Sequence, residues 1–169
     1  MNRYTIAILV QNQFGVLNRL TSMFRRRQFN ISSITASETE AAEYSRITIS
    51  FDGEEDGKVQ LINQLYKLPD VCSIKELTGE NSLNCELMLI KVKNDPAVRD
   101  DIHAAAEAFK AETIDYTRDS IVLQLIGNGT KMDNFITLMH DYTIILEICR
   151  TGTASLEKGS STLRQNLNL

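Results

Sequence analysis

The chain has 169 residues, 43% of them hydrophobic, with 18 basic and 22 acidic side chains and a formal net charge of −4. This length accommodates one ordinary domain or two small ones, and the apolar fraction suffices for packed cores. The acidic balance argues against a nucleic-acid partner, and no apolar run is long enough to span a membrane. Because the N-terminus lacks a signal-peptide pattern, we expect a cytoplasmic protein.

The first half of the chain predicts the order strand, helix, strand, strand, helix, strand. Apolar residues at helical spacing indicate the helices, and alternation or short apolar runs indicate the strands. The expected elements are a strand over 4–10, a helix over 16–27, a strand over 31–37, an acidic hairpin loop over 38–43, a strand over 44–51, a helix ended by Pro69 and a strand over 71–77. Alternation in the second strand places Ile31, Ser33 and Thr35 on one face.

The same order of elements restarts after residue 84. The expected elements are a strand over 85–92, a helix beginning at Pro96, a hairpin of strands over 113–117 and 121–126, a helix opened by Gly127-Asn128-Gly129 and a strand over 143–149. The order βαββαβ is that of the ferredoxin-like sandwich, which places two helices on one face of a four-stranded antiparallel sheet. The sequence therefore predicts an α+β protein made of two tandem ferredoxin-like βαββαβ sandwiches.

The composition along the chain suggests the domain boundaries. We expect a first domain over residues 1–77, a polar linker over 78–84, a second domain over 85–157 and a polar tail over 158–169. Each domain is small for an independent core, so association of the halves or of two chains would help to bury apolar surface. For the polar tail, the composition predicts either disorder or docking on a partner.

The loop between the first strand and the first helix is the strongest candidate for a binding site. Its glycine, Gly15, stands where the free N–H groups of a helix N-terminus begin, and such groups attract a carboxylate. Backbone N–H groups around Phe14–Leu17 are expected to hold it, since Gly15 has no side chain to obstruct the approach. Taken alone, however, a glycine after a strand is typical of an ordinary turn.

The sequence contains no constellation typical of catalysis or of a metal site. His103 and His140 have no partners at the spacing that metal ligands need. The three cysteines are odd in number and widely spaced, so neither a disulfide framework nor a zinc-thiolate site is predicted. We therefore expect a sensor of a small carboxylate metabolite that acts on a partner, with no catalytic residue and no cofactor of its own.

Motifs in both halves resemble one family. The Asn12-x-x-Gly15-Val16-Leu17 loop and the Asn30-Ile31 pair resemble an ACT domain, an amino-acid sensor. Three later segments resemble the C-terminal domain of the small, regulatory subunit of acetolactate synthase (acetohydroxyacid synthase): the strand over 86–92, Lys131-Met132-Asp133-Asn134-Phe135 and Ile148-Cys149-Arg150-Thr151-Gly152. The resemblance covers nearly the whole chain.

This resemblance implies a non-catalytic subunit of a transferase complex. In that family the large catalytic subunit carries thiamine diphosphate, magnesium and FAD. The small subunit raises its activity and confers feedback inhibition by a branched-chain amino acid, usually valine, in the synthesis of valine, isoleucine and leucine. Two alternative interpretations are a free-standing ACT-domain amino-acid sensor that regulates another enzyme or pathway, and an RNA-binding ferredoxin-like module. The second alternative would need a basic sheet and exposed aromatic residues, which the acidic sequence does not favour.

A geometric argument predicts a homodimer. Gly15 and Asn30 stand at opposite ends of the first helix, roughly 18–20 Å apart at the helical rise, so one chain cannot bring both to one small ligand. In the ferredoxin-like order the second strand lies at a sheet edge, and edge strands pair readily with partners. Antiparallel pairing of two such strands about a two-fold axis would bring the Gly15 end of one chain to the Asn30 end of the other.

The predicted effector site therefore lies between two chains and consists of Asn12, Phe14, Gly15, Val16, Leu17, Asn30 and Ile31. We expect Asn12 and the partner's Asn30 to hydrogen-bond the ammonium and carboxylate groups of the amino acid. Leu17 and Ile31 would wall its aliphatic side chain. As single residues, the two asparagines are also typical of helix caps and turns.

Overall fold

The computed structural model describes residues 2–77 and 79–165, and the chain divides into two compact units. Unit 1 comprises Met1–Leu83 and Gly152–Leu169, and unit 2 comprises Asn84–Thr151. Residues 1, 78 and 166–169, which fall in the predicted first domain, linker and polar tail, lie outside the described residues. Across the described ranges, no helix combines the length and apolar character needed to cross a membrane.

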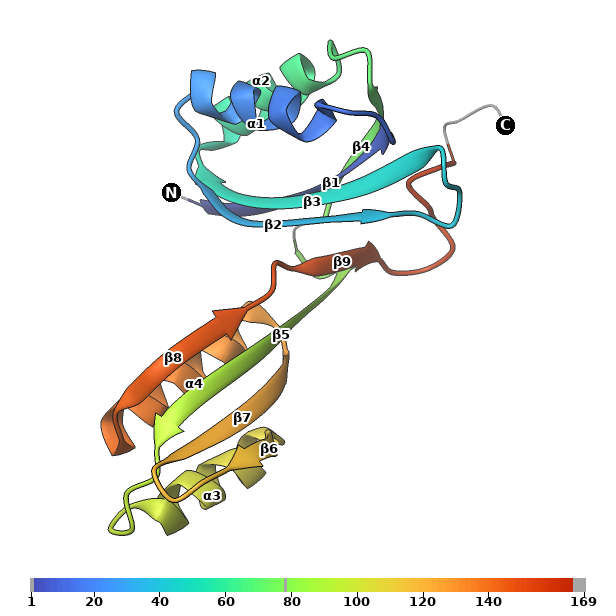
Figure 1. Ribbon diagram of the computed structural model, residues 1–169. Coiled ribbons are helices and arrows are strands. Elements are labelled where there is room, and N and C mark those ends of the chain that lie inside the picture. The colour runs from blue at the N-terminus through green and yellow to red at the C-terminus, as the bar shows by residue number, and fades with distance from the viewer. Residues whose placement is uncertain (1, 78, 166–169) are drawn as a thin grey trace. The chain divides into compact units, whose positions relative to one another are not determined.

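Unit 1 contains a four-stranded sheet in the order β2-β3-β1-β4, with both helices on one face (Figure 1). Its elements are β1 (Asn2–Gln11), α1 (Val16–Arg26), β2 (Ile31–Glu38), β3 (Tyr44–Gly53), α2 (Glu55–Leu65) and β4 (Val71–Glu76). Buried apolar side chains fill the space between helices and sheet, and the rings of Phe24 and Phe51 meet there edge to face. The ferredoxin-like fold predicted for the first half is confirmed.

A β-bulge in β2 decides which of its side chains face the helices. Ile31 pairs with Phe51, a core residue, but Ser33 pairs with the residue just before Phe51, so Ser32 is left over. An extra residue in one strand shifts the alternation of sides beyond it. The predicted common face of Ile31, Ser33 and Thr35 is therefore wrong: Ile31 faces the helices, whereas Ser33 and Thr35 face the opposite side of the sheet.

Unit 2 repeats the arrangement, with the sheet order β6-β7-β5-β8 and two helices on one face (Figure 1). Its elements are β5 (Ser82–Lys93), α3 (Arg99–Phe109), β6 (Glu112–Tyr116), β7 (Ser120–Gly127), α4 (Gly129–Tyr142) and β8 (Ile145–Arg150). The second predicted ferredoxin-like sandwich is thus confirmed. Several boundaries differ by one to three residues; in particular, β5 begins inside the predicted linker, and α3 begins at Arg99 instead of Pro96.

Arg150 joins three elements of unit 2 at the end of β8. Its Nε donates to Glu86 of β5 at 2.5 Å and its Nη1 donates to Asp133 of α4 at 2.7 Å. Burial alone would lower the pKa of the Arg150 guanidinium, but the hydrogen bonds to both carboxylates raise it above its ordinary value. The hydroxyl of Thr151 accepts from the backbone N–H of Leu87 at 3.0 Å. These contacts give Arg150 and Thr151 a structural role.

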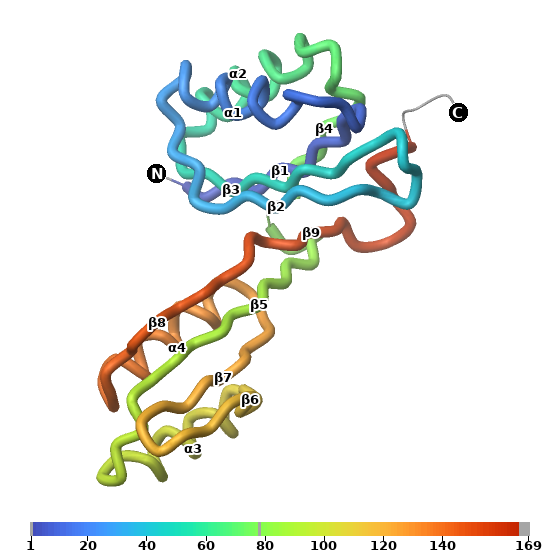
Figure 2. Tube along the Cα trace, viewed as in Figure 1, coloured from blue at the N-terminus to red at the C-terminus, as the bar shows by residue number. Residues whose placement is uncertain are grey.

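After residue 151 the chain returns to unit 1. A short strand, β9 (Ala154–Glu157), and the loop after it run along the sheet face that α1 and α2 leave uncovered (Figure 2). We call residues 152–165 the C-terminal segment. Its Leu163 is buried in a small apolar cluster with Ala7, Leu9 and Leu77.

Polar contacts also tie the C-terminal segment to unit 1. They are a hydrogen bond from Arg46 to the Ser155 carbonyl, an ion pair between Lys75 and Glu157, and an ion pair at 2.8 Å between Arg164 and Glu40. The domain boundary predicted at residue 157 differs from this arrangement, because 152–157 pack with unit 1. Over its described part, residues 158–165, the polar tail packs on unit 1 of its own chain through Leu163 and the ion pair of Arg164 with Glu40.

Candidate functional site

The loop before α1 presents a helix N-terminus that can receive an anion. Gly15 occupies the N-cap position with a φ of 79°, in the left-handed region that glycine adopts without strain. Within the described residues, no side chain caps this helix, and its first turn contains no acid. The free N–H groups and the positive end of the helix dipole are thus not neutralised by a local carboxylate.

One ion pair and one hydrogen bond of Arg19 hold this loop in place. Arg19, one turn into α1, pairs through Nε with Asp70 at 2.7 Å. Its Nη2 donates to the carbonyl of Phe14 at 3.5 Å. The carboxylate of Asp70 is almost fully buried, so this pair fixes the start of α1 against the end of β1, where Gln11 donates its N–H to the Asp70 carbonyl at 2.9 Å.

Beside the N-terminus of α1 lies a groove of about 240 Å³. Its walls come from the end of β1, the start of α1, the end of β2 and the start of β3. Apolar and polar side chains share the lining, which includes Val16, Leu17, Ala36, Ile47, Asn12 and Glu38. Small-molecule sites typically combine such an apolar wall with a few placed polar groups.

Asn12 is held at one end of the groove by the connection between β2 and β3. Its Nδ2 donates to the carbonyl of Ala42 at 3.1 Å and to Oε1 of Glu38 at 3.5 Å. Its backbone N–H donates to the carbonyl of Glu43 at 2.8 Å. Since the amide NH₂ is engaged within the chain, the amide oxygen is the group that can accept a hydrogen bond from a ligand ammonium.

The groove contains three of the seven predicted site residues, Asn12, Val16 and Leu17. Gly15 and Phe14 precede them in the loop, and the Phe14 side chain is fully exposed at 103%. Asn30 and Ile31 do not line the groove. They belong to the other end of α1 and β2, and five strand residues at about 3.4 Å each separate Ile31 from Ala36 by roughly 17 Å.

Most residues that line the groove are absent from the predicted site, and Ala36 and Glu38 of β2 are among them. The sequence predicts a solvated loop from Glu38 onward, whereas β2 extends to this residue. The bulge at Ser32 also places Ala36 opposite Ile47 on the helix side of the sheet. Had the predicted strand been extended by one residue, from 37 to 38, its alternation would have put Glu38 on the same face as Ala36. The bulge at Ser32, however, could not be predicted, because no residue pattern in the sequence indicates it.

The arrangement suits recognition of an α-amino acid. The helix N-terminus attracts a carboxylate, while Glu38 and the oxygen of Asn12 suit an ammonium. Leu17 and Ala36 offer apolar contact to a short aliphatic side chain. No group of three or more His, Cys, Asp or Glu side chains suited to a metal ion occurs over residues 2–77 and 79–165.

Two family models match the chain, one in each half. Residues 6–73 match the model described as the AHAS small subunit-like ACT domain. Residues 85–159 match the model described as the small subunit of acetolactate synthase.

Similar proteins of comparable length carry the same description. The acetolactate synthase small subunit of Bacillus subtilis is 42% identical over 157 residues, which cover 92% of this chain and 90% of that protein. The probable acetolactate synthase small subunit of Archaeoglobus fulgidus is 40% identical over 158 residues, covering 94% and 98%. The crystal structure of the acetolactate synthase small subunit from Thermotoga maritima superposes with a TM-score of 0.84 at 31% identity, covering 95% of this chain and all of that one.

Proposed function

The chain belongs to the family of acetolactate synthase small subunits, and from this we propose that it is the regulatory subunit of such an enzyme. It binds the large catalytic subunit, raises its activity and confers feedback inhibition by a branched-chain amino acid, with valine as the first candidate. Thiamine diphosphate, magnesium and FAD belong to the catalytic subunit. In this proposal the chain recognises the effector and transmits its binding to the catalytic subunit, which carries out the reaction.

One observation carries the effector part of this proposal. An uncapped helix N-terminus opens beside a groove that also contains an acid, an amide oxygen and apolar side chains. A zwitterion with an aliphatic side chain requires a partner for its carboxylate, acceptors for its ammonium and apolar contacts, and these features supply all three. Their joint occurrence at the Gly15 loop supports the assignment of Asn12, Gly15, Val16 and Leu17 to the effector site.

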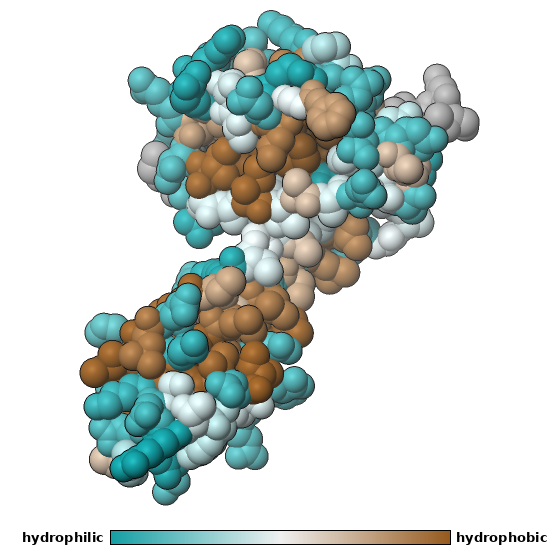
Figure 3. Space-filling model, viewed as in Figure 1, coloured by the Kyte–Doolittle hydropathy of each residue, from teal (hydrophilic) through white to brown (hydrophobic). Residues whose placement is uncertain are grey.

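We further propose that a second copy of the chain completes this site. β2 is one of the two edge strands in the sheet of unit 1, and antiparallel pairing of two β2 strands would bring Asn30 and Ile31 of the second copy to the Ala36–Glu38 end of the first. Apolar surface gathers between α1 and β2 (Figure 3), where Leu17 and Ile34 are exposed by 44% and 38%. A contact along β2 would cover this surface.

A site shared between two chains explains how the effector acts. A ligand that binds the dimer and not the separated chains stabilises the dimer by an amount that rises with the ratio of ligand concentration to Kd. The response passed to the catalytic subunit is expected to be of ordinary allosteric size, about 1–3 kcal/mol.

Substituting Gly15 tests the effector site. Gly15→Asp places a carboxylate where the ligand carboxylate would bind, and it also adds about 1–2 kcal/mol of left-handed backbone strain. We expect this variant to keep activating the catalytic subunit while losing inhibition by valine. The measurements are the activity of the reconstituted holoenzyme against valine concentration and calorimetric titration of the isolated chain with valine, leucine and isoleucine.

Gly79→Asp is the matched control, because Gly79 also has a positive φ, 93°, and a Cβ there would meet no atom within 4 Å. It lies away from the groove and should leave inhibition intact. A Gly15→Asp holoenzyme that responds to valine as the unaltered one does would refute the site assignment.

A further inference from the structure

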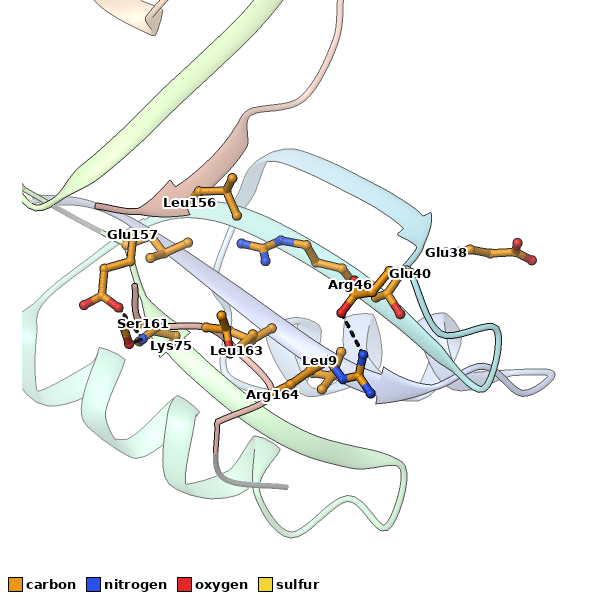
Figure 4. A pocket seen from close by; sticks show the side chains of 13 residues that line it. Leu9, Glu38, Glu40, Arg46, Lys75, Leu156, Glu157, Ser161, Leu163 and Arg164 are labelled. Carbon is orange, nitrogen blue, oxygen red and sulfur yellow. Dashed lines mark hydrogen bonds and ion pairs between the residues drawn. The ribbon is translucent and has the colours of Figure 1, made fainter. Parts of the chain in front are cut away.

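Unit 1 contains a second cavity, of about 370 Å³, on the sheet face opposite its helices (Figure 4). The cavity lies between the sheet and the C-terminal segment, so both contribute to its lining. Glu38 is common to this cavity and to the groove beside α1, and Figure 4 shows its carboxylate pointing away from Arg46. Although they share Glu38, the groove beside α1 and this cavity lie on opposite faces of the sheet and are lined by different side chains.

Four leucines form the apolar part of this cavity. Leu9 and Leu77 come from the sheet and the residue after β4, while Leu156 and Leu163 come from the C-terminal segment. Leu9, Leu77 and Leu163 are almost completely buried, whereas Leu156 remains 60% exposed. A short hydrocarbon chain of a ligand would contact the leucines of the sheet on one side and the leucines of the C-terminal segment on the other.

Three cations also line the cavity, and two of them are already neutralised. Lys75 pairs with Glu157, and Arg164 pairs with Glu40 at 2.8 Å, as the dashed lines in Figure 4 mark. These two ion pairs join the sheet and the β2–β3 connection to the C-terminal segment. In both ion pairs the cation and the carboxylate already neutralise each other, so neither requires a charged ligand.

Arg46 is the third cation, and its contact is with a neutral group. Its Nη2 donates to the carbonyl of Ser155, and no carboxylate of the described residues lies within hydrogen-bonding distance of its guanidinium. Burial lowers the pKa of Arg46 from its ordinary value, against a weaker opposing effect of the more distant Glu40. A guanidinium has five N–H donors in a planar fork that matches a carboxylate, so Arg46 has spare donors for one.

We propose that this cavity binds a small aliphatic monocarboxylate, whose carboxylate pairs with Arg46 and whose hydrocarbon chain packs among the four leucines. An α-amino acid fits less well, because Glu40 and Glu157 are already paired and Glu38 points away. The ligand contacts both the sheet and the C-terminal segment. It therefore stabilises the docked position of that segment by an amount that rises with the ratio of ligand concentration to Kd.

The test uses the full-length chain and 4-methylpentanoate as the probe, with the uncharged 4-methylpentanamide as its matched control. We expect calorimetry to detect binding of the carboxylate and slower hydrogen exchange over residues 154–164 when it is bound. The amide should bind at least about tenfold more weakly, since it cannot form an ion pair. Equal affinity for the two compounds, or no binding of the carboxylate up to its solubility limit, would overturn the proposal.

Variants locate the bound probe. Arg46→Gln should weaken the affinity for 4-methylpentanoate about tenfold or more. Arg46→Lys should weaken it less, because lysine keeps the positive charge but lacks the planar guanidinium that binds both carboxylate oxygens. Gly15→Asp, altered in the other groove, should bind the probe like the unaltered chain. Loss of binding in Gly15→Asp together with retention in Arg46→Gln would place the probe in the groove beside α1 and refute the second site.

Discussion

At the residue scale, Gly152 shows what the absence of a side chain makes possible. A Cβ at this position would lie 2.6 Å from the carbonyl oxygen and 2.8 Å from the carbonyl carbon of Ile34. Both are backbone atoms of β2, which cannot rotate away as a side chain can. Glycine therefore allows the C-terminal segment to begin directly against β2. This contact explains why the last residue of the Arg-Thr-Gly motif is a glycine.

We predict that Gly152→Ala destabilises unit 1 by about 2 kcal/mol, within the range of other overpacked sites. Hydrogen exchange over 154–164 should become faster, because the segment must move off β2. Gly129→Ala is the matched control: its Cβ would meet side-chain atoms of Arg150 at 3.3 Å and Glu86 at 3.5 Å but no backbone atom within 4 Å, and the substitution should cost less than about 1 kcal/mol. Urea unfolding provides the comparison, and equal losses in the two variants would contradict this account of Gly152.

At the element scale, the guanidinium of Arg150 connects β8 to β5 and α4. The side chain of Glu86 is 9% exposed, so removal of Arg150 would leave a nearly buried carboxylate without its cation. Breaking such a pair costs more than the pair contributes, because the remaining charge keeps its desolvation penalty.

Arg150→Met should accordingly destabilise unit 2 by about 3 kcal/mol. Arg150→Lys should cost less, since it retains the charge but cannot reach both carboxylates with one planar fork. Arg118→Met, in the exposed turn between β6 and β7, should change the free energy of unfolding by no more than about 0.5 kcal/mol. The prediction fails if Arg150→Met unfolds at the same urea concentration as Arg118→Met.

The edge strand β2 is the other element with a testable role. If two chains pair along β2, Ile34→Lys places two like charges near the two-fold axis and should shift the chain toward monomers. Val59→Lys alters a residue of similar exposure, 48%, on α2 and should leave the assembly unchanged. Sedimentation velocity distinguishes the outcomes, and an unaltered chain that is monomeric with or without valine would rule out the shared site.

At the scale of the whole molecule, paired carboxylates hold the C-terminal segment on unit 1. The hydrogen bond from Arg164 lowers the pKa of Glu40, and Arg46 adds a weaker effect. Hydrogen bonds from Lys75 and then Ser161 lower the pKa of Glu157. Because both values fall below that of an unfolded glutamate, about 4.3, the stabilisation is present above that pH and is lost as the pH falls through the folded-state values.

We therefore predict that acidification from about pH 5 to pH 3 releases the C-terminal segment. Methyl NMR of Leu163 should report the release as a shift toward the position of an exposed leucine. In the Glu40→Gln, Glu157→Gln double variant the Leu163 signal should depend much less on pH, since no carboxylate remains to be protonated at these contacts. Identical titration curves for the two proteins would show that other groups control the docking.

The fold and the start of the candidate site could be predicted because local features determine them. The helical spacing of Val16, Leu20 and Phe24 requires no knowledge of distant residues, and these side chains are buried in the core as that spacing implies. Likewise, a glycine directly before an apolar helical stripe identified the N-terminus of α1. The two βαββαβ patterns follow from the same local periodicities and so determine the fold class.

Only the tertiary structure decided the features that depend on distant contacts. The bulge at Ser32 arises in the pairing of β2 with β3, and it moves Ala36 and Glu38 into the groove and Thr35 to the opposite face. The docking of the C-terminal segment likewise depends on Leu163 meeting Leu9 and Leu77, which are far away in the chain. Periodicity describes which side of an element is apolar, but it contains no information on which distant surface will cover that side.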